Sequence, residues 1–388
     1  MTLDIIHSKA KKKKGKTGSG KKKRNWSWFL ILFLNFLAVL PLFTSYAAPY
    51  IDPGTNTIVA FFGLAYPLFF VINALFILIW LFRKSWMFLF PVLSLTVGYP
   101  HINSFFRLPV KEKKVEGAKI KVLSYNVRLF DIYNWTGKGK GEASKEIFEF
   151  IDKQEADLVC FQEFYDDNSQ HPAHLRKLIE NRKTKNYHIE MAGNLPSKPI
   201  FGLATFSRFP VINRQKVMFT NSKNNFGIFS DLLVNEDTIR VFNVHLESLH
   251  FDKHDYALVS GNTQSEEELK VRSKRIFGKI RTAFVKRATQ AEELLSVINQ
   301  SPYPVIVCGD FNDTPMSYVY RMLTRNLNDS FRDSGNGFQF TYAGKIPLLR
   351  IDYILYDHHF NSVYSKVHSI RCSDHYPVTS GLVYQKGI

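Results

Sequence analysis

The sequence predicts an α/β domain with a large mixed sheet, preceded by a membrane region of about three helices. Two observations support this fold class. Three long apolar runs lie within the first 106 of the 388 residues. From residue 120 onward, short apolar strands alternate with amphipathic helices, without any internal repeat. Strands mixed with helices over this length are typical of a single α/β domain.

The first 25 residues are strongly basic. Ten positively charged residues and no acidic residue lie between Lys9 and Arg24, and the formal net charge of the chain is +17. Glycine and serine interrupt this run, which cannot bury apolar surface, so we expect it to be disordered. Nucleic-acid binding is one interpretation. The apolar run that follows favours a topology signal or a contact with anionic lipids.

Residues 26–106 form the predicted membrane region. The first apolar run begins at Trp26 and is about as long as a helix needs to cross roughly 30 Å of hydrocarbon. The two later runs are residues 57–82 and 86–106. A signal peptide also places a basic segment before an apolar run, but this run is long for one and two more follow. The third run contains Pro91, Gly98 and Pro100, which makes it the weakest of the three.

The short loops between the apolar runs predict an orientation. The loop at residues 49–56 has no lysine or arginine and contains Asp52, whereas the next loop contains Arg83 and Lys84. Because basic loops stay in the cytoplasm, we expect an integral protein of the cell (inner) membrane with a cytoplasmic N-terminus. With three spans, the C-terminal domain lies outside the cytoplasm. If residues 86–106 only lie in the interface, the domain is cytoplasmic.

After a predicted linker at residues 107–119, the domain of residues 120–388 begins with a strand at residues 120–127. A helix at residues 143–154 and a strand at residues 157–163 come next. Later strands begin at Gly202, Arg240, Pro304 and Ile351, and a helix covers residues 289–300. The spacing of apolar residues supports each assignment.

Residues 264–286 combine an apolar stripe with many basic residues. Ile276, Ile280 and Phe284 lie four residues apart, and lysines and arginines surround them. One interpretation is a surface helix that lies on a membrane or on an anionic substrate. The other is a helix that packs its stripe on the domain and keeps its lysines in water.

The three cysteines are Cys160, Cys308 and Cys372, and each lies in or beside a predicted core strand. Their number is odd, and their spacing lacks the short pairs of a zinc site. We therefore expect small buried hydrophobic side chains rather than disulfides or metal ligands.

Six groups of polar side chains lie at the ends of predicted strands or in the adjoining loops. They are Asn126, Glu163, His245, Asp310 with Asn312, Asp352, and Asp374 with His375. In α/β sheets, functional sites gather at such strand ends. Each residue alone has a structural alternative, such as a turn, an ion pair or a buried hydrogen-bonded histidine. Together they suit a hard divalent cation held by oxygen ligands, with two histidines that transfer protons near neutral pH.

The segments around these residues resemble the successive signatures of the endonuclease/exonuclease/phosphatase superfamily, the Mg²⁺-dependent phosphodiesterases similar to DNase I. They read SYNVR, FQEF, NVHLES, GDFND, IDYIL and SDHYPV, in family order, over about residues 120–386. TFSRFPV resembles a further family segment. The resemblance implies a four-layered α/β sandwich, in which two mixed sheets pack face to face and helices cover them.

The resemblance also implies a metal site. Glu163 is similar to the principal Mg²⁺ ligand of the family, with Asn126 and Asp374 nearby as metal or water ligands. Mg²⁺ is therefore the expected cofactor, and Mn²⁺ is a possible substitute.

The resemblance assigns five residues to catalysis. His375 is similar to the histidine that activates the attacking water, and Asp352 to its carboxylate partner. Asp310 and Asn312 resemble the pair that orients the nucleophile and the scissile phosphate. His245 resembles the histidine that binds a phosphate oxygen or protonates the leaving group. Structural and direct roles both stay open for Glu247, Asp313 and Arg350, which adjoin the signatures.

These observations predict a membrane-anchored, metal-dependent phosphodiesterase or phosphatase that works by in-line attack of water. A lipid phosphodiester suits a site tethered to a bilayer, and extracytoplasmic nucleic acid is the alternative substrate. A non-catalytic binding protein on the same fold is less well supported, because every essential group is present. The expected partners are the lipid bilayer and the phosphoester substrate, without an obligate protein partner.

Overall fold

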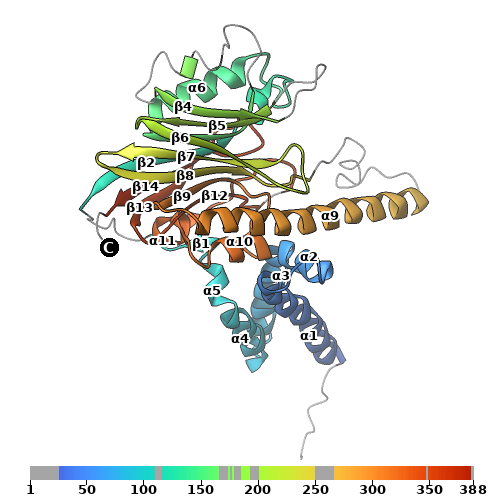
Figure 1. Cartoon of the computed structure of the whole chain (residues 1–388). Coiled ribbons are helices and arrows are strands. Elements are labelled where there is room, and N and C mark those ends of the chain that lie inside the picture. Colours follow the sequence, from blue (N-terminus) through green and yellow to red (C-terminus); the bar gives the residue numbers. More distant parts are fainter. Residues whose placement is uncertain are drawn as a thin grey trace, which may run out of the picture.

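The computed structural model describes residues 26–109, 116–165, 174, 177–178, 185–192, 201–249, 266–346 and 348–385. The expected basic tail, residues 1–25, lies outside the described residues, as do residues 110–115 of the expected linker. Figure 1 shows two parts, a sandwich of sheets and helices and a helical bundle that leaves the sandwich on one side.

Two six-stranded mixed sheets form the sandwich. The strand order is β13-β14-β2-β3-β5-β4 in the first sheet and β10-β12-β9-β8-β7-β6 in the second. The strands are β2 (Ala118–Asn126), β3 (Leu158–Tyr165), β4 (Asn186–Met191), β5 (Phe201–Ser207), β6 (Val211–Met218), β7 (Phe226–Val234), β8 (Asp237–His245), β9 (Val305–Asp310), β10 (Asn328–Asp329), β12 (Asp352–Tyr356), β13 (Phe360–Val367) and β14 (Val378–Tyr384). Strands β2 and β3 pair in parallel, as do β8 and β9, and the other neighbours pair antiparallel.

The sheets pack face to face because apolar side chains alternate along their strands. In β9, Ile306 and Cys308 belong to the core between the sheets, whereas Val307 packs on the outer side with α9 (Glu266–Asn299). The outer face of the first sheet is covered by α6 (Glu142–Gln154). Successive side chains of β9 thus point to opposite faces of the sheet, and both faces are buried in an apolar core. The expected sandwich of two mixed sheets flanked by helices is confirmed.

Smaller elements complete the sandwich: η3 (Arg128–Asp131), α10 (Tyr318–Leu323), α11 (Ser330–Ser334) and β11 (Gly337–Phe338). The basic stretch and the helix expected at residues 289–300 form one continuous helix, α9, of 34 residues. Within the apolar stripe, Phe284 is buried, and Phe61 of the N-terminal helices lies edge-on to it with ring centroids 5.3 Å apart. At Phe284 the stripe thus packs on the protein itself, while Ile276 and Ile280 are half-buried.

The prediction for the cysteines is confirmed. All three are free and buried, with Cys160 and Cys308 between the two sheets. Cys372 packs in the core under α6, where its thiol donates a hydrogen bond to Glu146 Oε2 at 3.1 Å.

The predicted membrane region differs from the expected three spans. Its elements are α1 (Trp26–Ala47), η1 (Ala48–Tyr50), α2 (Thr57–Leu64), α3 (Tyr66–Phe82), η2 (Trp86–Phe88), α4 (Leu89–Val97) and α5 (Tyr99–Ile102). Among the described residues, only the helix at Trp26–Tyr50 is long and apolar enough to cross a membrane, or two are if the bent pair α2–α3 counts as one span. The prediction of about three spans is therefore wrong.

Backbone chemistry explains the difference. The second apolar run bends by 59° between Leu64 and Tyr66, where Pro67 lies in the first turn of α3 and has no N–H to continue the α2 ladder. In the third run, the short helix α4 ends at Gly98, and Pro100 follows in the four-residue α5. Apolar composition alone therefore overstated the length of both helices.

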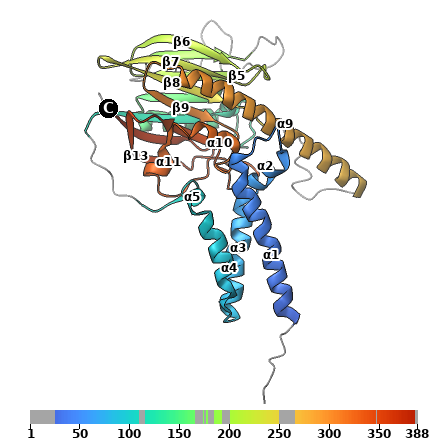
Figure 2. The ribbon, with the colours of Figure 1, turned by 60° about the horizontal axis from the view of Figure 1, so that its bottom comes forward.

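The bundle is held by buried polar contacts between its helices. Trp80 Nε1 of α3 donates to Asn35 Oδ1 of α1 at 3.0 Å, and Asn73 Nδ2 donates to the backbone oxygen of Ala38 at 3.0 Å. At the far end from the sandwich, Arg83 donates to Ser27 Oγ at 3.2 Å. Figure 2 shows α1, α3 and α4 running side by side away from the sandwich. Interhelical hydrogen bonds of this kind fix helix packing where solvent is apolar.

The near end of the bundle docks tightly on the sandwich. The chain leaves α5 through β1 (Phe106–Arg107), which pairs antiparallel with β11. The guanidinium of Arg350 donates to the backbone oxygen of Ser104 at 3.0 Å. A Cβ atom at Gly63 of α2 would lie 2.4 Å from the backbone oxygen of Met316, so only glycine allows this approach. The two parts are thus packed directly against each other.

Candidate active site

The polar residues expected at strand ends meet at one edge of the sandwich. Asn126 ends β2 and Glu163 lies near the end of β3, in the first sheet. His245 and Asp310 end β8 and β9 in the second sheet, where they are register partners, and Asp352 begins β12 beside Asp310. Because β2 with β3 and β8 with β9 run parallel, their carboxyl ends bring these side chains to the same edge.

Asn126 joins the two sheets through its side chain. Its Nδ2 donates to Glu163 Oε1 at 3.2 Å and to Asp310 Oδ2 at 3.0 Å, while its Oδ1 accepts from the backbone N–H of Arg128 at 3.1 Å. The side chain is fully buried. Asn126 therefore orients two carboxylates, one from each sheet, toward a common space.

His375 and Asp352 form a buried imidazole–carboxylate pair. The Nδ1 atom of His375 lies 3.1 and 3.0 Å from the two carboxylate oxygens of Asp352. The other ring nitrogen, Nε2, lies 3.6 Å from Asp310 Oδ2. An imidazole held at Nδ1 by a carboxylate presents Nε2 for proton transfer. This is the arrangement that the expected general base requires.

His245 approaches the same carboxylate oxygen of Asp310 as His375 does. Its Nε2 is 3.7 Å from Asp310 Oδ2 and 3.8 Å from Glu163 Oε1. Asn312 lies next to it, with a backbone N–H that donates to Asp310 Oδ1 at 2.8 Å and an Nδ2 that donates to the backbone oxygen of Leu246 at 3.1 Å. Two histidines thus flank one buried carboxylate.

Two of the site residues have positive φ angles, which residues other than glycine rarely adopt. Glu163 has φ of 49° and Asn312 has φ of 52°. At Glu163, the pairing of β3 with β5 shifts register between Phe161 and Phe164, so a bulge turns the carboxylate toward the site. Strain of this kind persists where the surrounding structure fixes it, and it is frequent at functional sites.

The proximity of charges and the burial of the site change its acid–base properties. Burial and the charge of Asp374 raise the pKa of Glu163 above its ordinary value. Burial raises the pKa of Asp310 to about 6, against the opposing effect of His375. Burial alone would lower the pKa of His375, but the charges of Asp352 and Asp310 raise it well above the ordinary value. His375 is therefore a stronger proton acceptor than a free imidazole.

The residues present suit a divalent cation. Glu163 and Asp374 line the same cavity of about 210 Å³, together with Asp310 and His375. Repulsion between the carboxylates of Glu163 and Asp374 is what a bound cation would relieve. The ligand atoms of Asp310, Asp352 and His375 also lie within 4.8 Å of one another, a second group with metal-binding chemistry. Carboxylate oxygens are the ligands that hard cations prefer.

The three residues whose roles were left open have structural contacts. Glu247 accepts from Lys286 Nζ at 2.8 Å, and Asp313 accepts from Arg287 Nε at 3.2 Å, so both hold α9 to the site edge. The buried guanidinium of Arg350 donates to both carboxylate oxygens of Asp329 at 2.6 Å. Each of these residues thus takes part in an ion pair.

The cavity also contains residues that sequence reasoning had not assigned to a site. Arg128 places Nε 3.3 Å from Asp374 Oδ2, and Tyr342 lies edge-on to the His375 ring at 5.4 Å. Arg128 belongs to the SYNVR segment, which was a usable signal, whereas Tyr342 has none. Leu64, the last residue of α2, also lines the cavity. The N-terminal helical bundle therefore supplies part of the wall of the site.

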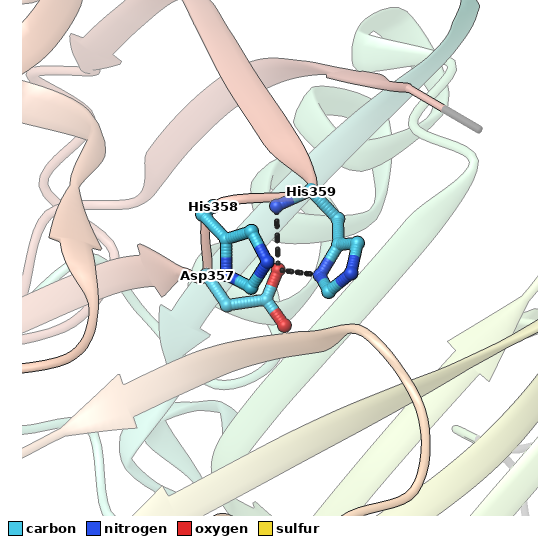
Figure 3. A group of neighbouring side chains, drawn as sticks. All are labelled: Asp357, His358 and His359. Atoms are coloured by element: carbon cyan, nitrogen blue, oxygen red, sulfur yellow. Dashed lines mark hydrogen bonds and ion pairs between the residues drawn. The ribbon is translucent and has the colours of Figure 1, made fainter. Parts of the chain in front are cut away.

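A second cluster of aspartate and histidine lies at the other end of β12 (Figure 3). It consists of Asp357, His358 and His359 in the turn before β13. Asp357 Oδ1 accepts from the backbone N–H of His359 at 3.0 Å and also contacts His359 Nδ1 at 3.0 Å, while Oδ2 accepts from the backbone N–H of Val305 at 2.7 Å. The carboxylate of Asp357 thus holds the turn together.

Comparisons with known proteins agree with this geometry. The profile of the Endonuclease/Exonuclease/phosphatase family matches residues 123–375, and a family described only as a domain of unknown function matches residues 28–105. No curated protein gives a significant match.

Several solved structures are similar to the sandwich, two of them with a TM-score of 0.50. One is an endonuclease/exonuclease/phosphatase family protein from Bacteroides thetaiotaomicron, with TM-score 0.50 and 16% identity, over 70% of this chain and 100% of that one. Another is a functionally unknown conserved protein from Enterococcus faecalis V583, with TM-score 0.50 and 16% identity, over 69% of this chain and 100% of that one. The human Nocturnin catalytic domain matches with TM-score 0.49 and 18% identity, over 72% of this chain and 97% of that one.

Proposed function

Because this chain belongs to the endonuclease/exonuclease/phosphatase family, we propose that it is a divalent-metal-dependent phosphoester hydrolase anchored in a membrane. The observation that carries this proposal is the convergence of His375, Asp310 and Glu163 at one cavity, with Asp352 paired to His375 behind it. These groups supply a base, its orienting carboxylate and an acidic site for a cation. In-line attack of water on a phosphoester requires this set.

The residues divide the reaction between them. His375 takes the proton of the attacking water at Nε2, and Asp352 holds the ring by Nδ1 and stabilises the imidazolium. Asp310 lies between the two histidines and orients the nucleophile. His245, whose Nε2 lies 3.7 Å from Asp310 Oδ2, serves a phosphoryl oxygen or the leaving group. Asn312 positions this arrangement through its contacts with Asp310 and Leu246.

A cation would be held by Glu163 and Asp374, and Asn126 orients Glu163 for this role. When bound, Mg²⁺ or Mn²⁺ would act as a Lewis acid that stabilises the negative charge on the phosphoryl group. The preference of Mg²⁺ for carboxylate oxygens supports it as the natural ion, with Mn²⁺ as a substitute.

The placement of the bundle supports an anchored enzyme whose catalytic domain lies opposite the basic tail. Arg83 and Ser27 meet at the far end of the bundle. At the near end, the guanidinium carbon of Arg321 from the sandwich lies 4.2 Å from the ring centroid of Tyr50. Helix α3 leads away from the sandwich and α4 leads back to it (Figure 2), so together they do not change the side of the membrane on which the domain lies. The direction of α1 alone therefore decides that side. With the basic residues in the cytoplasm, the domain is extracytoplasmic.

Hydrolysis of a panel of phosphoesters tests the activity. The full chain in detergent, with Mg²⁺ or Mn²⁺, should release product from lipid phosphodiesters, DNA, RNA or inositol phosphates, and the His375→Ala variant should not. No turnover on any class, or equal turnover by the variant, contradicts the proposal. Preferred cleavage of DNA or RNA over lipids would favour an extracytoplasmic nuclease.

Reporter fusions test the orientation. A reporter active only outside the cytoplasm should work after Ile388 and fail before Trp26. A cytoplasmic C-terminus would contradict the proposed side of the domain, whatever the activity.

A further inference from the structure

An apolar groove of about 400 Å³ lies where the bundle meets the sandwich. Its walls come from three separate segments: Pro67, Phe70 and Val71 of α3, Phe106 of β1, and Phe338 and Leu348 of the sandwich. Apart from the hydroxyl of Tyr66, all of the side chains that line it are hydrocarbon. A cavity of this size lies within the range of small-molecule sites.

The groove is built by specific contacts. Phe106 and Phe338 are register partners in the β1–β11 pair, with ring centroids 4.7 Å apart, and Phe338 also stacks on Phe340. Phe338 nevertheless has 65% of its surface exposed, and Val71 has 48%. An apolar surface this open beside an apolar helical bundle suits a hydrocarbon ligand or the bilayer itself.

The groove adjoins the catalytic cavity along two segments of the chain. At the α2–α3 bend, Leu64 lines the cavity whereas Tyr66 and Pro67 line the groove. In the loop before β12, Leu349 lines the cavity whereas its neighbour Leu348 lines the groove. In each segment, the residue that lines the cavity and the residue that lines the groove are therefore one or two positions apart in the chain.

The loop that divides the two spaces is tied to the catalytic residues. The backbone N–H groups of Thr341 and Tyr342 donate to the backbone oxygen of Leu349 at 2.9 and 3.1 Å, and that of Ala343 donates to the backbone oxygen of Asp374 at 2.7 Å. Leu348 has φ of 67°, a conformation that leucine rarely adopts. Its neighbours thus hold this apolar side chain at the groove, directly beside the acidic site.

We propose that the groove binds one hydrocarbon chain of a lipid phosphoester whose phosphate lies in the catalytic cavity. This inference rests on the proposed function, and it names the class of substrate. The polar cavity takes the phosphate, the adjoining apolar groove takes the chain, and the helices of the bundle give the chain a path from the bilayer. The bend at Ala65 is then a working part of the enzyme, since it places Leu64 and Tyr66 in the two different walls.

Alkyl 4-nitrophenyl phosphates that differ only in the alkyl group test this proposal. With the full chain in detergent and Mg²⁺ or Mn²⁺, kcat/KM should rise from the methyl to the hexadecyl ester, by about fourfold for each methylene group that enters the groove. The Val71→Trp variant, which fills the groove, should lower the ratio of hexadecyl to methyl kcat/KM about tenfold or more.

The Leu75→Trp variant is the matched control. Leu75 lies one turn further along α3, has 52% of its surface exposed and does not line the groove. Detergent concentrates every long-chain ester, whichever variant is assayed. Leu75→Trp should nevertheless keep the ratio of hexadecyl to methyl kcat/KM that the unmutated protein has. A kcat/KM independent of chain length, or an equal loss of the ratio in both variants, overturns the proposal.

A photolabel separates this inference from the proposed activity. Hexadecyl phosphate with a diazirine at the end of its chain should label the peptides that contain residues 66–71 or 337–349, and the label should disappear in Val71→Trp but persist in Leu75→Trp. Labelling spread evenly over the outer surface of the bundle overturns the groove. Specific labelling without turnover of any ester would leave the groove in place and contradict the hydrolase.

Discussion

The two ends of strand β12 carry the same residue types in different surroundings. Asp352 at one end and Asp357 just past the other each contact the Nδ1 atom of a histidine, His375 and His359, at a shortest distance of 3.0 Å. Asp352 and His375 are buried among further charged groups, whereas His359 is half-buried and the neighbouring His358 is exposed. The pairing of aspartate with histidine therefore does not by itself make a site.

The difference lies in what else each carboxylate serves. Asp357 accepts backbone N–H groups from His359 and Val305, so its charge is used to hold a turn. At the other end, the backbone N–H of Asp352 donates to Thr341 Oγ1, and both carboxylate oxygens of Asp352 face Nδ1 of His375. The carboxylate of Asp310 then adds a second negative charge beside Nε2, the other ring nitrogen of His375. Burial and convergence of charges convert a common pair into a reactive one.

The largest expected effect is that of metal removal. Chelation should reduce turnover to background, and Mg²⁺ or Mn²⁺ should restore it, because the acidic cavity then regains its cation. The double variant Asp357→Ala/His359→Ala should respond as the unmutated protein does, whereas Glu163→Gln should stay inactive after the ion is added. Full turnover in excess chelator, or loss of the metal response in the double variant, would place the metal elsewhere.

The next largest effect compares the two histidines. His375→Ala should lower kcat by about 10²–10⁴-fold, as expected for loss of a general base, while its thermal unfolding stays cooperative. His359→Ala should leave kcat unchanged, since its ring lies at the opposite end of the strand. The same assay on both variants decides the point, and an equal loss of kcat in both would remove the distinction between the two ends.

A smaller effect is expected where the N-terminal helical bundle meets the sandwich, beside the reactive end of β12. Gly63→Ala should destabilise the protein by about 1–3 kcal/mol and lower turnover, because its Cβ would collide with the backbone oxygen of Met316 and displace α2 from the cavity wall. Gly278→Ala in α9, where a Cβ meets nothing within 4 Å, is the matched control and should be neutral or slightly stabilising. Thermal unfolding and turnover of both variants in detergent measure this, and a fully active, fully stable Gly63→Ala contradicts it.

The smallest effect is expected at the turn. Asp357→Ala should lower the free energy of unfolding by about 1 kcal/mol, since the backbone N–H groups of Val305 and His359 lose their acceptor. Turnover per folded molecule should not change. Chemical denaturation with a parallel activity assay checks both parts, and a loss of kcat would mean that the turn contributes to the reaction.

The sequence predicted the reactive end well because its polar residues interrupt apolar strands. Asp310 directly follows Val307, Cys308 and Gly309, so the end of the buried strand was visible, and the same holds for Asn126 after β2. The mixed α/β class followed from the alternation of strands and helices, whereas the sandwich of two sheets came from the resemblance to the family. The roles of the individual residues stay predictions.

Other features had no local signal. The bend between Leu64 and Tyr66 could be suspected from Pro67, but the packing of α2 against Met316 depends on residues more than 250 positions apart in the chain. The continuity of α9 was missed because its two halves differ in composition. Tyr342 and Leu348 reach the two cavities through a loop whose path is set by tertiary hydrogen bonds to Leu349 and Asp374. Such contacts cannot be read from periodicity.

The most direct test of this account is a double-mutant cycle for turnover at the reactive end of β12. If His375 is the base and Asp352 acts only through it, the double variant Asp352→Asn/His375→Ala should be no slower than His375→Ala alone, because the two residues act as one unit. The corresponding pair Asp357→Asn/His359→Ala should retain the unmutated rate. Multiplicative losses from Asp352→Asn and His375→Ala, or a comparable loss at the turn, would contradict the account.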